Sequence, residues 1–241
     1  MAVDRINFPS IVAVQQGAGY RIYMLGGEDE DTKILDSCEF IDVGNDHWTL
    51  LDAKMSTSRT RARAVLLDHT TVVICGGYDD DTNDLSSCDS LDLTTHTFSP
   101  FPDMLVPRYG HAGVHYNGTI VVIGGGYNEK SCEQFDPAVF KWTPFAPLPA
   151  GGYTDAVVVE CKIYVVVASI CSLQVYDGAT WSVVTRIPQN YRPGPVVALE
   201  GKMVVFNWCQ EDADVFDPAT NSWSCISMMF QSRRRAVVVS F

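Results

Sequence analysis

The sequence of 241 residues predicts an all-β fold, a β-propeller built from four-stranded antiparallel blades. The first observation is one unit, best seen at residues 119–149. An apolar, β-branched run at 120–123 ends at three glycines, a polar loop follows, and another strand closes at Asp136-Pro137. Trp142 marks a last short strand. Glycine and proline end such strands because they favour turns and interrupt strand pairing.

The second observation is that this unit recurs. The apolar strand returns at residues 22–25, 72–75, 163–167 and 203–206, and the aromatic anchor of the last strand returns as Trp48, Phe98, Trp181 and Trp223. The spacing of the anchors is that of a propeller blade. We therefore expect one domain with blades at about 11–52, 59–100, 108–146, 152–185 and 192–226, and a C-terminal strand at 233–241. This surplus strand leaves two alternatives, a five-bladed ring or part of a six-bladed ring.

The repeats resemble those of the kelch family over nearly the whole chain. Kelch blades carry a double glycine after the second strand, a Tyr-Asp or Phe-Asp-Pro ending the third, and a tryptophan in the fourth. The residues that carry this resemblance, and to which we assign a structural role, are Gly26, Gly27, Gly76, Gly77, Gly124, Gly125, Trp48, Trp142, Trp181 and Trp223. The fourth and fifth copies have Val167-Ala168 and Asn207-Trp208 in place of the double glycine, so their turns are expected to differ.

Composition and charge agree with a soluble, single-domain protein. Apolar residues make up 46% of the chain and charged residues 19%, and the net charge of −12 argues against nucleic-acid binding. The sequence has neither a membrane-spanning apolar run nor a secretory signal, so we expect a cytoplasmic protein without membrane contact. The cysteines Cys38, Cys75, Cys88 and Cys132 are interpreted as reduced core residues. No metal site or cofactor is expected, because no C-x-x-C pair is present.

Two classes of loop carry the candidate binding residues. A Met-x-x-x-Arg pattern recurs in the connections between blades, and an acidic or aromatic loop follows the second strand in the first, second, third and fifth repeats. The kelch resemblance implies that both classes meet on one face around the central channel and bind a partner. The predicted partner-binding residues are Arg59, Arg61, Arg108, Tyr109, Arg192, Arg233, Arg234, Tyr78, Tyr127 and Tyr153. Because arginine recognises carboxylates, an acidic peptide is the expected ligand. The alternative is that each repeat arginine pairs with an acidic loop of a neighbouring blade and holds the ring together.

The sequence therefore predicts a protein-interaction module, an adaptor or substrate-recognition subunit, and no enzyme. The kelch resemblance implies ubiquitin-ligase components or actin as partners, but no BTB domain accompanies the repeats, so neither role is supported. The alternative class is a propeller enzyme that acts on carbohydrate or uses a metal. His111 and His115 lie too far apart on a strand to share an ion. The acidic run at 79–84 lacks the glycine and glutamate of a calcium loop.

Overall fold

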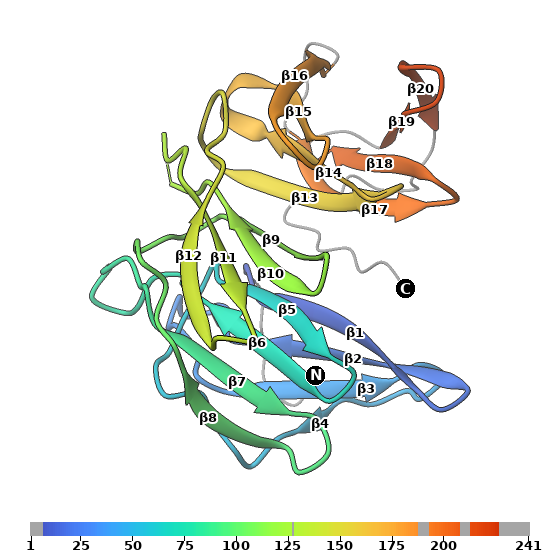
Figure 1. The fold of residues 1–241 in the computed structure, drawn as a ribbon. Helices are drawn as coiled ribbons and strands as arrows, with labels where there is room; N and C mark the ends of the chain where they lie inside the picture. Colours follow the sequence, from blue (N-terminus) through green and yellow to red (C-terminus); the bar gives the residue numbers. More distant parts are fainter. Residues whose placement is uncertain (1–6, 127, 188–192, 208–212, 227–241) are drawn as a thin grey trace.

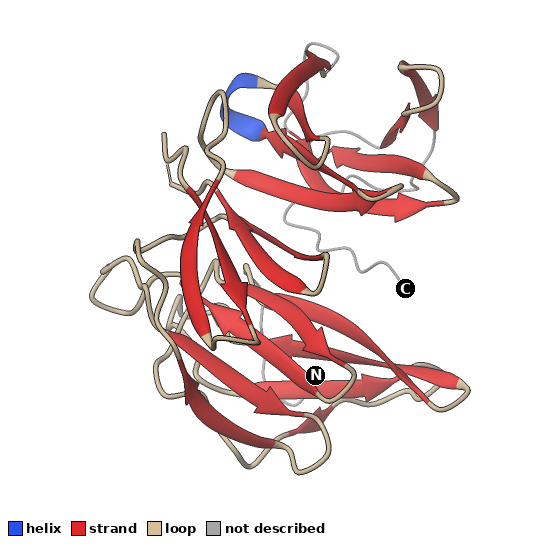
Figure 2. Ribbon diagram, viewed as in Figure 1, coloured by secondary structure: helices blue, strands red, loops and turns tan. Residues whose placement is uncertain are grey.

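The computed structural model describes residues 7–126, 128–187, 193–207 and 213–226. These residues form five four-stranded antiparallel sheets, each a blade of a β-propeller, which confirms the predicted fold class. Figure 2 shows strands almost throughout, with one short 3-10 helix, η1 (Ala168–Ile170). The predicted strand at 233–241 lies outside the described residues.

The strands follow one another in each blade in chain order. Blade one contains β1 (Ser10–Gln16), β2 (Gly19–Leu25), β3 (Cys38–Asp42) and β4 (Thr49–Leu50); blade two contains β5 (Arg63–Asp68), β6 (Thr71–Cys75), β7 (Cys88–Asp92) and β8 (Thr97–Phe101). Blade three contains β9 (Ala112–Tyr116), β10 (Thr119–Ile123), β11 (Cys132–Asp136) and β12 (Lys141–Phe145); blade four contains β13 (Thr154–Val159), β14 (Lys162–Val167), β15 (Ser172–Tyr176) and β16 (Trp181–Arg186). Blade five contains β17 (Pro193–Leu199), β18 (Lys202–Asn207), β19 (Ala213–Asp217) and β20 (Ser222–Ile226).

The antiparallel order fixes which loops share an end of the molecule. The second strand of each blade returns to the end at which the first began, and the fourth does the same, so two kinds of joint gather there. These are the loops from second to third strand and the connections from one blade to the next. We call this end the connection end. The short hairpins between first and second strands lie at the opposite end, and Asn117-Gly118 forms one of them with positive φ at both residues.

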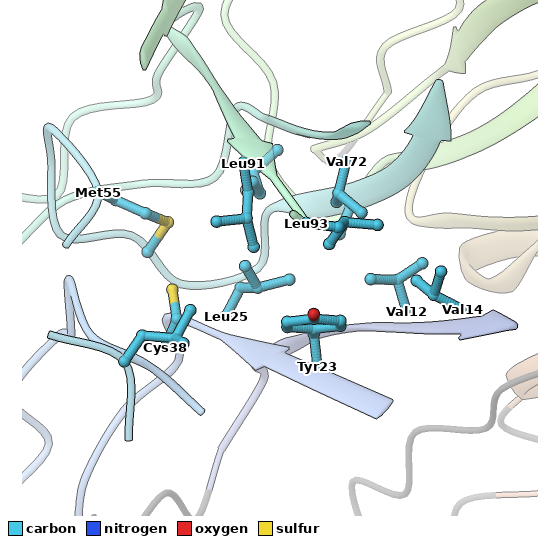
Figure 3. Close-up of a cluster of buried hydrophobic side chains, with 12 residues drawn as sticks. Val12, Val14, Tyr23, Leu25, Cys38, Met55, Val72, Leu91 and Leu93 are labelled. Carbon is cyan, nitrogen blue, oxygen red and sulfur yellow. The ribbon is translucent and has the colours of Figure 1, made fainter. Parts of the chain in front are cut away.

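The first strands line the inside of the propeller, where β1, β5, β9, β13 and β17 are neighbours in succession (Figure 1). Each pair of blades that follow one another along the chain shares a separate apolar core. Between blades one and two, Tyr23 and Leu25 of β2 face Val72 and Leu91 of blade two (Figure 3). Successive side chains of each second strand point to opposite faces of the blade, so every other side chain packs against the same neighbouring blade. Cys38, Cys75, Cys88 and Cys132 are buried thiols, as predicted.

The double glycine allows the connections to approach the blades closely. Gly76 and Gly77 have φ of 63° and 92°, a conformation that favours glycine. A Cβ on Gly76 would lie 2.5 Å from the carbonyl oxygen of Arg108, and a Cβ on Gly77 would lie 2.5 Å from that of Thr60. The glycines therefore make room for the backbone of the connections on both sides of blade two.

The tryptophan anchors differ in their surroundings. Trp142 is buried between blades two and three, and its Nε1 donates a hydrogen bond to the carbonyl oxygen of Pro102 (2.8 Å). Trp181 and Trp223 are partly buried and pack at the next two blade interfaces. Trp48 is partly exposed and belongs to none of the core clusters found among the described residues.

Replacing Trp142 by alanine is expected to lower the free energy of unfolding by about 3–5 kcal/mol, because a buried indole and its hydrogen bond are lost from a blade interface. Urea denaturation measures the loss. Trp48→Ala is the matched control and should cost clearly less, since its indole is partly exposed. Equal losses in the two variants would contradict this role for Trp142.

Candidate functional site

Arg59 connects blades one and two by both its backbone and its side chain. Its carbonyl oxygen accepts a hydrogen bond from the N–H of Gly27 in blade one (2.9 Å). Its fully buried guanidinium donates to the carbonyl oxygens of Gly76 (3.0 Å) and Ser87 (2.8 Å) in blade two. There it also forms an ion pair with Asp89 (2.9 Å). One residue thus joins two blades.

Arg108 repeats this arrangement between blades two and three. Its carbonyl oxygen accepts from the N–H of Gly77 (2.8 Å), and its buried guanidinium donates to the carbonyl oxygens of Gly124 (2.9 Å) and Ser131 (2.7 Å). The guanidinium also forms an ion pair with Glu133 (2.8 Å). Every charge in this contact is neutralised away from water.

These two arrangements change the sequence-based interpretation. The prediction that Arg59 and Arg108 contact a partner requires exposed guanidinium groups, and both groups are fully buried. We therefore revise it: the two arginines hold neighbouring blades together, as the alternative supposed. Their acidic partners, Asp89 and Glu133, were not anticipated, since both lie on third strands and not in the acidic loops. The signal was present, because an acidic residue follows cysteine at the start of the third strand in blades one to three.

Arg108→Met should lower the free energy of unfolding by about 3–5 kcal/mol, because it leaves the carboxylate of Glu133 buried without its charged partner. Adding Glu133→Gln should recover part of this loss by removing the unpaired charge. Urea denaturation of the single and double variants tests both statements. A melting temperature unchanged by Arg108→Met would show that the ion pair does not stabilise the ring.

A third ion pair crosses the inner strands just below the connection end. Arg63 at the start of β5 pairs with Asp155 of β13, two blades away. Gly113 of β9 allows this, since a Cβ there would lie 2.7 Å from Cγ of Arg63. The other carboxylate oxygen of Asp155 accepts a hydrogen bond from the N–H of Val196 in β17 (3.0 Å). These contacts connect blades two, four and five and place side chains across the space between the inner strands.

His111 is buried directly before β9, in the connection from blade two to blade three. It is 2% exposed, and neither ring nitrogen has a hydrogen-bond partner among the described residues. Burial, and then the positive charges of Arg108 and Arg63, hold its pKa well below the ordinary histidine value. His115, on β9, is exposed. Within the described ranges, no group of three histidine, cysteine or acidic side chains is arranged to hold a metal ion.

The lowered pKa of His111 predicts a loss of stability in mild acid. Below about pH 6.5 the unfolded chain takes up a proton at this histidine that the folded protein does not bind. The contribution is therefore fully present above that pH and is lost as the pH falls. Between about pH 7.5 and 5.5 we expect His111 to lower the free energy of unfolding by about 1 kcal/mol.

Urea denaturation at both pH values measures this loss in the parent protein and in His111→Leu, which should lack this share of it. His115→Gln is the control, because His115 is exposed, and should keep the full pH dependence. Some dependence remains in every variant, since the pKa of His96 is also lowered, by burial and then by Arg21. Identical pH dependence in the His111 variant and the parent would contradict the assignment.

Three tyrosines form a row at the connection end, which we call the tyrosine row. Tyr78 follows the double glycine of blade two, Tyr109 lies in the connection to blade three, and Tyr153 lies in the connection to blade four. The rings of Tyr78 and Tyr109 meet edge to face with centroids 5.7 Å apart, and those of Tyr109 and Tyr153 do so at 5.8 Å. All three residues are partly exposed. The row therefore offers connected aromatic surface along three blades.

Arg61 extends the row toward blade one. Its guanidinium carbon lies 4.1 Å from the centroid of the Phe8 ring and 5.8 Å from that of Tyr78. The hydroxyl of Tyr78 donates to the carboxylate of Glu28 (3.3 Å). Burial, as the largest cause, raises the pKa of Tyr78, so its hydroxyl stays protonated at neutral pH. Arg61 and Phe8 thus continue the surface of the tyrosine row through Tyr78. The binding role of Arg61, Tyr78, Tyr109 and Tyr153 stays a prediction.

Two acidic loops, residues 28–34 and 78–84, border the row. Each is closed in the same way: Asp29 accepts hydrogen bonds from the backbone N–H groups two and four residues later, and Asp79 does the same. Asp80 joins the two loops by accepting from the N–H of Ile34 (3.0 Å). Backbone hydrogen bonds, first that from Asn83, lower the pKa of Asp79. The loops therefore hold ionised carboxylates at fixed positions.

The remaining predicted partner-binding residues, Tyr127, Arg192, Arg233 and Arg234, lie outside the described residues. No helix in the described part of the chain is long and apolar enough to cross a membrane.

Comparison with known proteins agrees with the architecture. The family model of the kelch motif matches residues 59–105 and 107–149, which contain the strands of blades two and three. Blades two and three are thus built from kelch motifs, within an all-β propeller of five four-stranded blades. It is 26% identical to Kelch-like protein 25 of Xenopus tropicalis over 168 residues, which is 59% of this chain and 28% of that protein. It is 30% identical to a putative F-box/kelch-repeat protein of Arabidopsis thaliana over 149 residues, 55% of this chain and 37% of that protein. The chain thus matches about a third of the length of each relative.

The kelch repeat departs from its pattern in blade four, as the sequence predicted. Where the double glycine is absent, the chain forms the 3-10 helix η1 after β14, and Cys171 takes a left-handed conformation at its end. The corresponding turn of blade five, at 208–212, lies outside the described residues.

Proposed function

We propose that this kelch propeller is a protein-interaction module that binds a partner protein at the connection end, with the tyrosine row as the centre of contact. The observation that carries the proposal is the row itself, three partly exposed tyrosines in mutual contact beside Arg61. Tyrosine and arginine are enriched at the energetic centres of protein interfaces, because they bury large, rigid surfaces and keep a polar group. The kelch relatives support the same general role.

Hydrogen bonds between blades hold the backbone of the tyrosine row in place, which favours partner binding. The backbones that carry Tyr78 and Tyr109 are held by hydrogen bonds across blades, from Tyr78 N–H to the Thr60 carbonyl (3.0 Å) and from Gly110 N–H to the Arg61 carbonyl (2.9 Å). A rigid scaffold lowers the entropy lost when a partner binds. Leu105, 52% exposed in the connection before Tyr109, adds apolar surface.

We also propose that the module binds without catalysing a reaction on its partner. At the connection end the hydroxyls of Ser58 and Thr60 donate to Asp80 (2.9 Å) and Glu28 (3.1 Å), and these contacts bind loops to one another. Incubation of the purified protein with a panel of sugars, together with metal analysis, addresses the enzyme alternative. Turnover, or one bound metal ion per chain, would contradict a function of binding alone.

The test of the proposed surface is a comparison of partner recovery. Affinity purification of the parent protein and of Tyr109→Ala, followed by mass spectrometry, should show proteins that are recovered with the parent and lost with the variant. We expect at least a tenfold reduction, since the central tyrosine of the row contacts both others and truncation of an interface centre typically costs about 2 kcal/mol or more.

Tyr20→Ala is the matched control, because Tyr20 is also partly exposed but lies on β2 next to the hairpin at the opposite end. It should retain all partners. Both variants should keep the melting temperature of the parent within a few degrees, so that a loss of binding is not a loss of fold. Recovery of the same proteins with Tyr109→Ala as with Tyr20→Ala would contradict the proposed surface.

A further inference from the structure

We infer that the connection end recognises a basic segment of its partner, one with lysine or arginine side chains around an aromatic or apolar residue. This inference rests on the proposed function and reverses the acidic ligand that the sequence suggested. It depends on three features of the connection end: the aromatic surface of the tyrosine row, the charge of the loops beside it, and the partners of the arginines.

The arginines that favoured an acidic ligand are already neutralised. Arg59 and Arg108 are buried in ion pairs with acidic residues of blades two and three. Arg63 pairs with Asp155 below the surface. Of the predicted arginines that the structure describes, Arg61 alone borders the row, and its guanidinium lies over the ring of Phe8. Among the described residues, an acidic peptide would therefore meet little positive charge that is free to bind it.

The acidic loops provide the opposite charge. They contain eight acidic residues against the single cation Lys33: Glu28, Asp29, Glu30, Asp31, Asp79, Asp80, Asp81 and Asp84. None of these carboxylates forms an ion pair with another described residue. Asp31 and Asp81 are exposed at the loop tips. Their charge is screened only by solvent ions, over a distance of about 8–10 Å at physiological salt.

The tyrosine row supplies the short-range part of the recognition. Aromatic faces attract lysine and arginine side chains, and the Arg61 contact with Phe8 and Tyr78 shows this geometry at the site itself. The loops and the row are in direct contact, since Glu28 accepts hydrogen bonds from the hydroxyls of Tyr78 (3.3 Å) and Thr60 (3.1 Å). A cationic side chain on the row would thus lie beside carboxylates. Charge complementarity and aromatic surface together select a basic segment.

The experiment is a phage-display selection from a random dodecapeptide library on the intact protein, followed by affinity measurements with the enriched synthetic peptides. Peptides that depend on Tyr109 should be enriched in lysine and arginine. Their binding should weaken about tenfold between 50 and 500 mM salt, as screening of several charge contacts requires.

Asp31→Asn combined with Asp81→Asn removes one charge from each loop without breaking it, because neither side chain takes part in the hydrogen bonds that close the loops. We expect this double variant to bind about three- to tenfold more weakly at low salt, mainly through slower association. The matched control is Glu160→Gln with Glu200→Gln, two exposed acids at the opposite end, which should leave binding unchanged.

The outcomes separate this inference from the proposed function. Neutral or acidic peptides that need Tyr109 would overturn the basic ligand and leave the proposed surface intact. Equal affinities for the loop variant and its control would do the same. If no enriched peptide depends on Tyr109, both the inference and the proposed surface fail.

Discussion

The buried arginine between two blades is the contact on which the rest of the structure depends. A blade alone exposes apolar faces, so the propeller is stable only when neighbours stay in register. The carbonyl oxygen of Arg59 is bound to one blade and its guanidinium to the next, and Arg108 does the same one repeat later. The double glycines are part of this contact, because any larger residue would collide with the arginine backbone.

Blade four shows how the fold changes where the arginine–carboxylate ion pair is absent. Gly152 stands where the earlier connections have arginine, since its carbonyl oxygen accepts from the N–H of Gly125 as that of Arg108 accepts from Gly77. The third strand carries Gln174 where blades two and three carry Asp89 and Glu133. The amide of Gln174 donates to the carbonyl oxygen of Ala150 (3.0 Å), so a neutral hydrogen bond replaces the ion pair. A carboxylate without the arginine would be buried and unpaired, which is costly. In blades two to four, arginine and acid are therefore kept together or replaced together.

The sequence was sufficient for the fold but not for the direction of the arginine side chains. Repeated apolar runs, glycine pairs and Asp-ended strands predicted the blades, because strand period and turn chemistry are local properties. The Met-x-x-x-Arg spacing placed Arg59 and Arg108 in the connections, yet burial depends on residues 25 to 30 positions away on another strand. Topology alone brings the loops that carry Tyr78, Tyr109 and Tyr153 to one end, whereas the contact of Tyr78 with Arg61 was not predicted.

The same contacts that hold the ring also decide the charge of its surface. Arg59 and Arg108 use their charges inside the protein, so they add no basic character to the connection end. The carboxylates of the acidic loops need no buried charged partner, because they bind backbone N–H groups and remain in contact with water. Stability and recognition are thus linked through position: the arginines stabilise the blades from within, and the carboxylates beside the tyrosine row determine which partners approach. The charge of a binding surface in a repeat protein therefore depends on which repeat residues are buried, and not on their number.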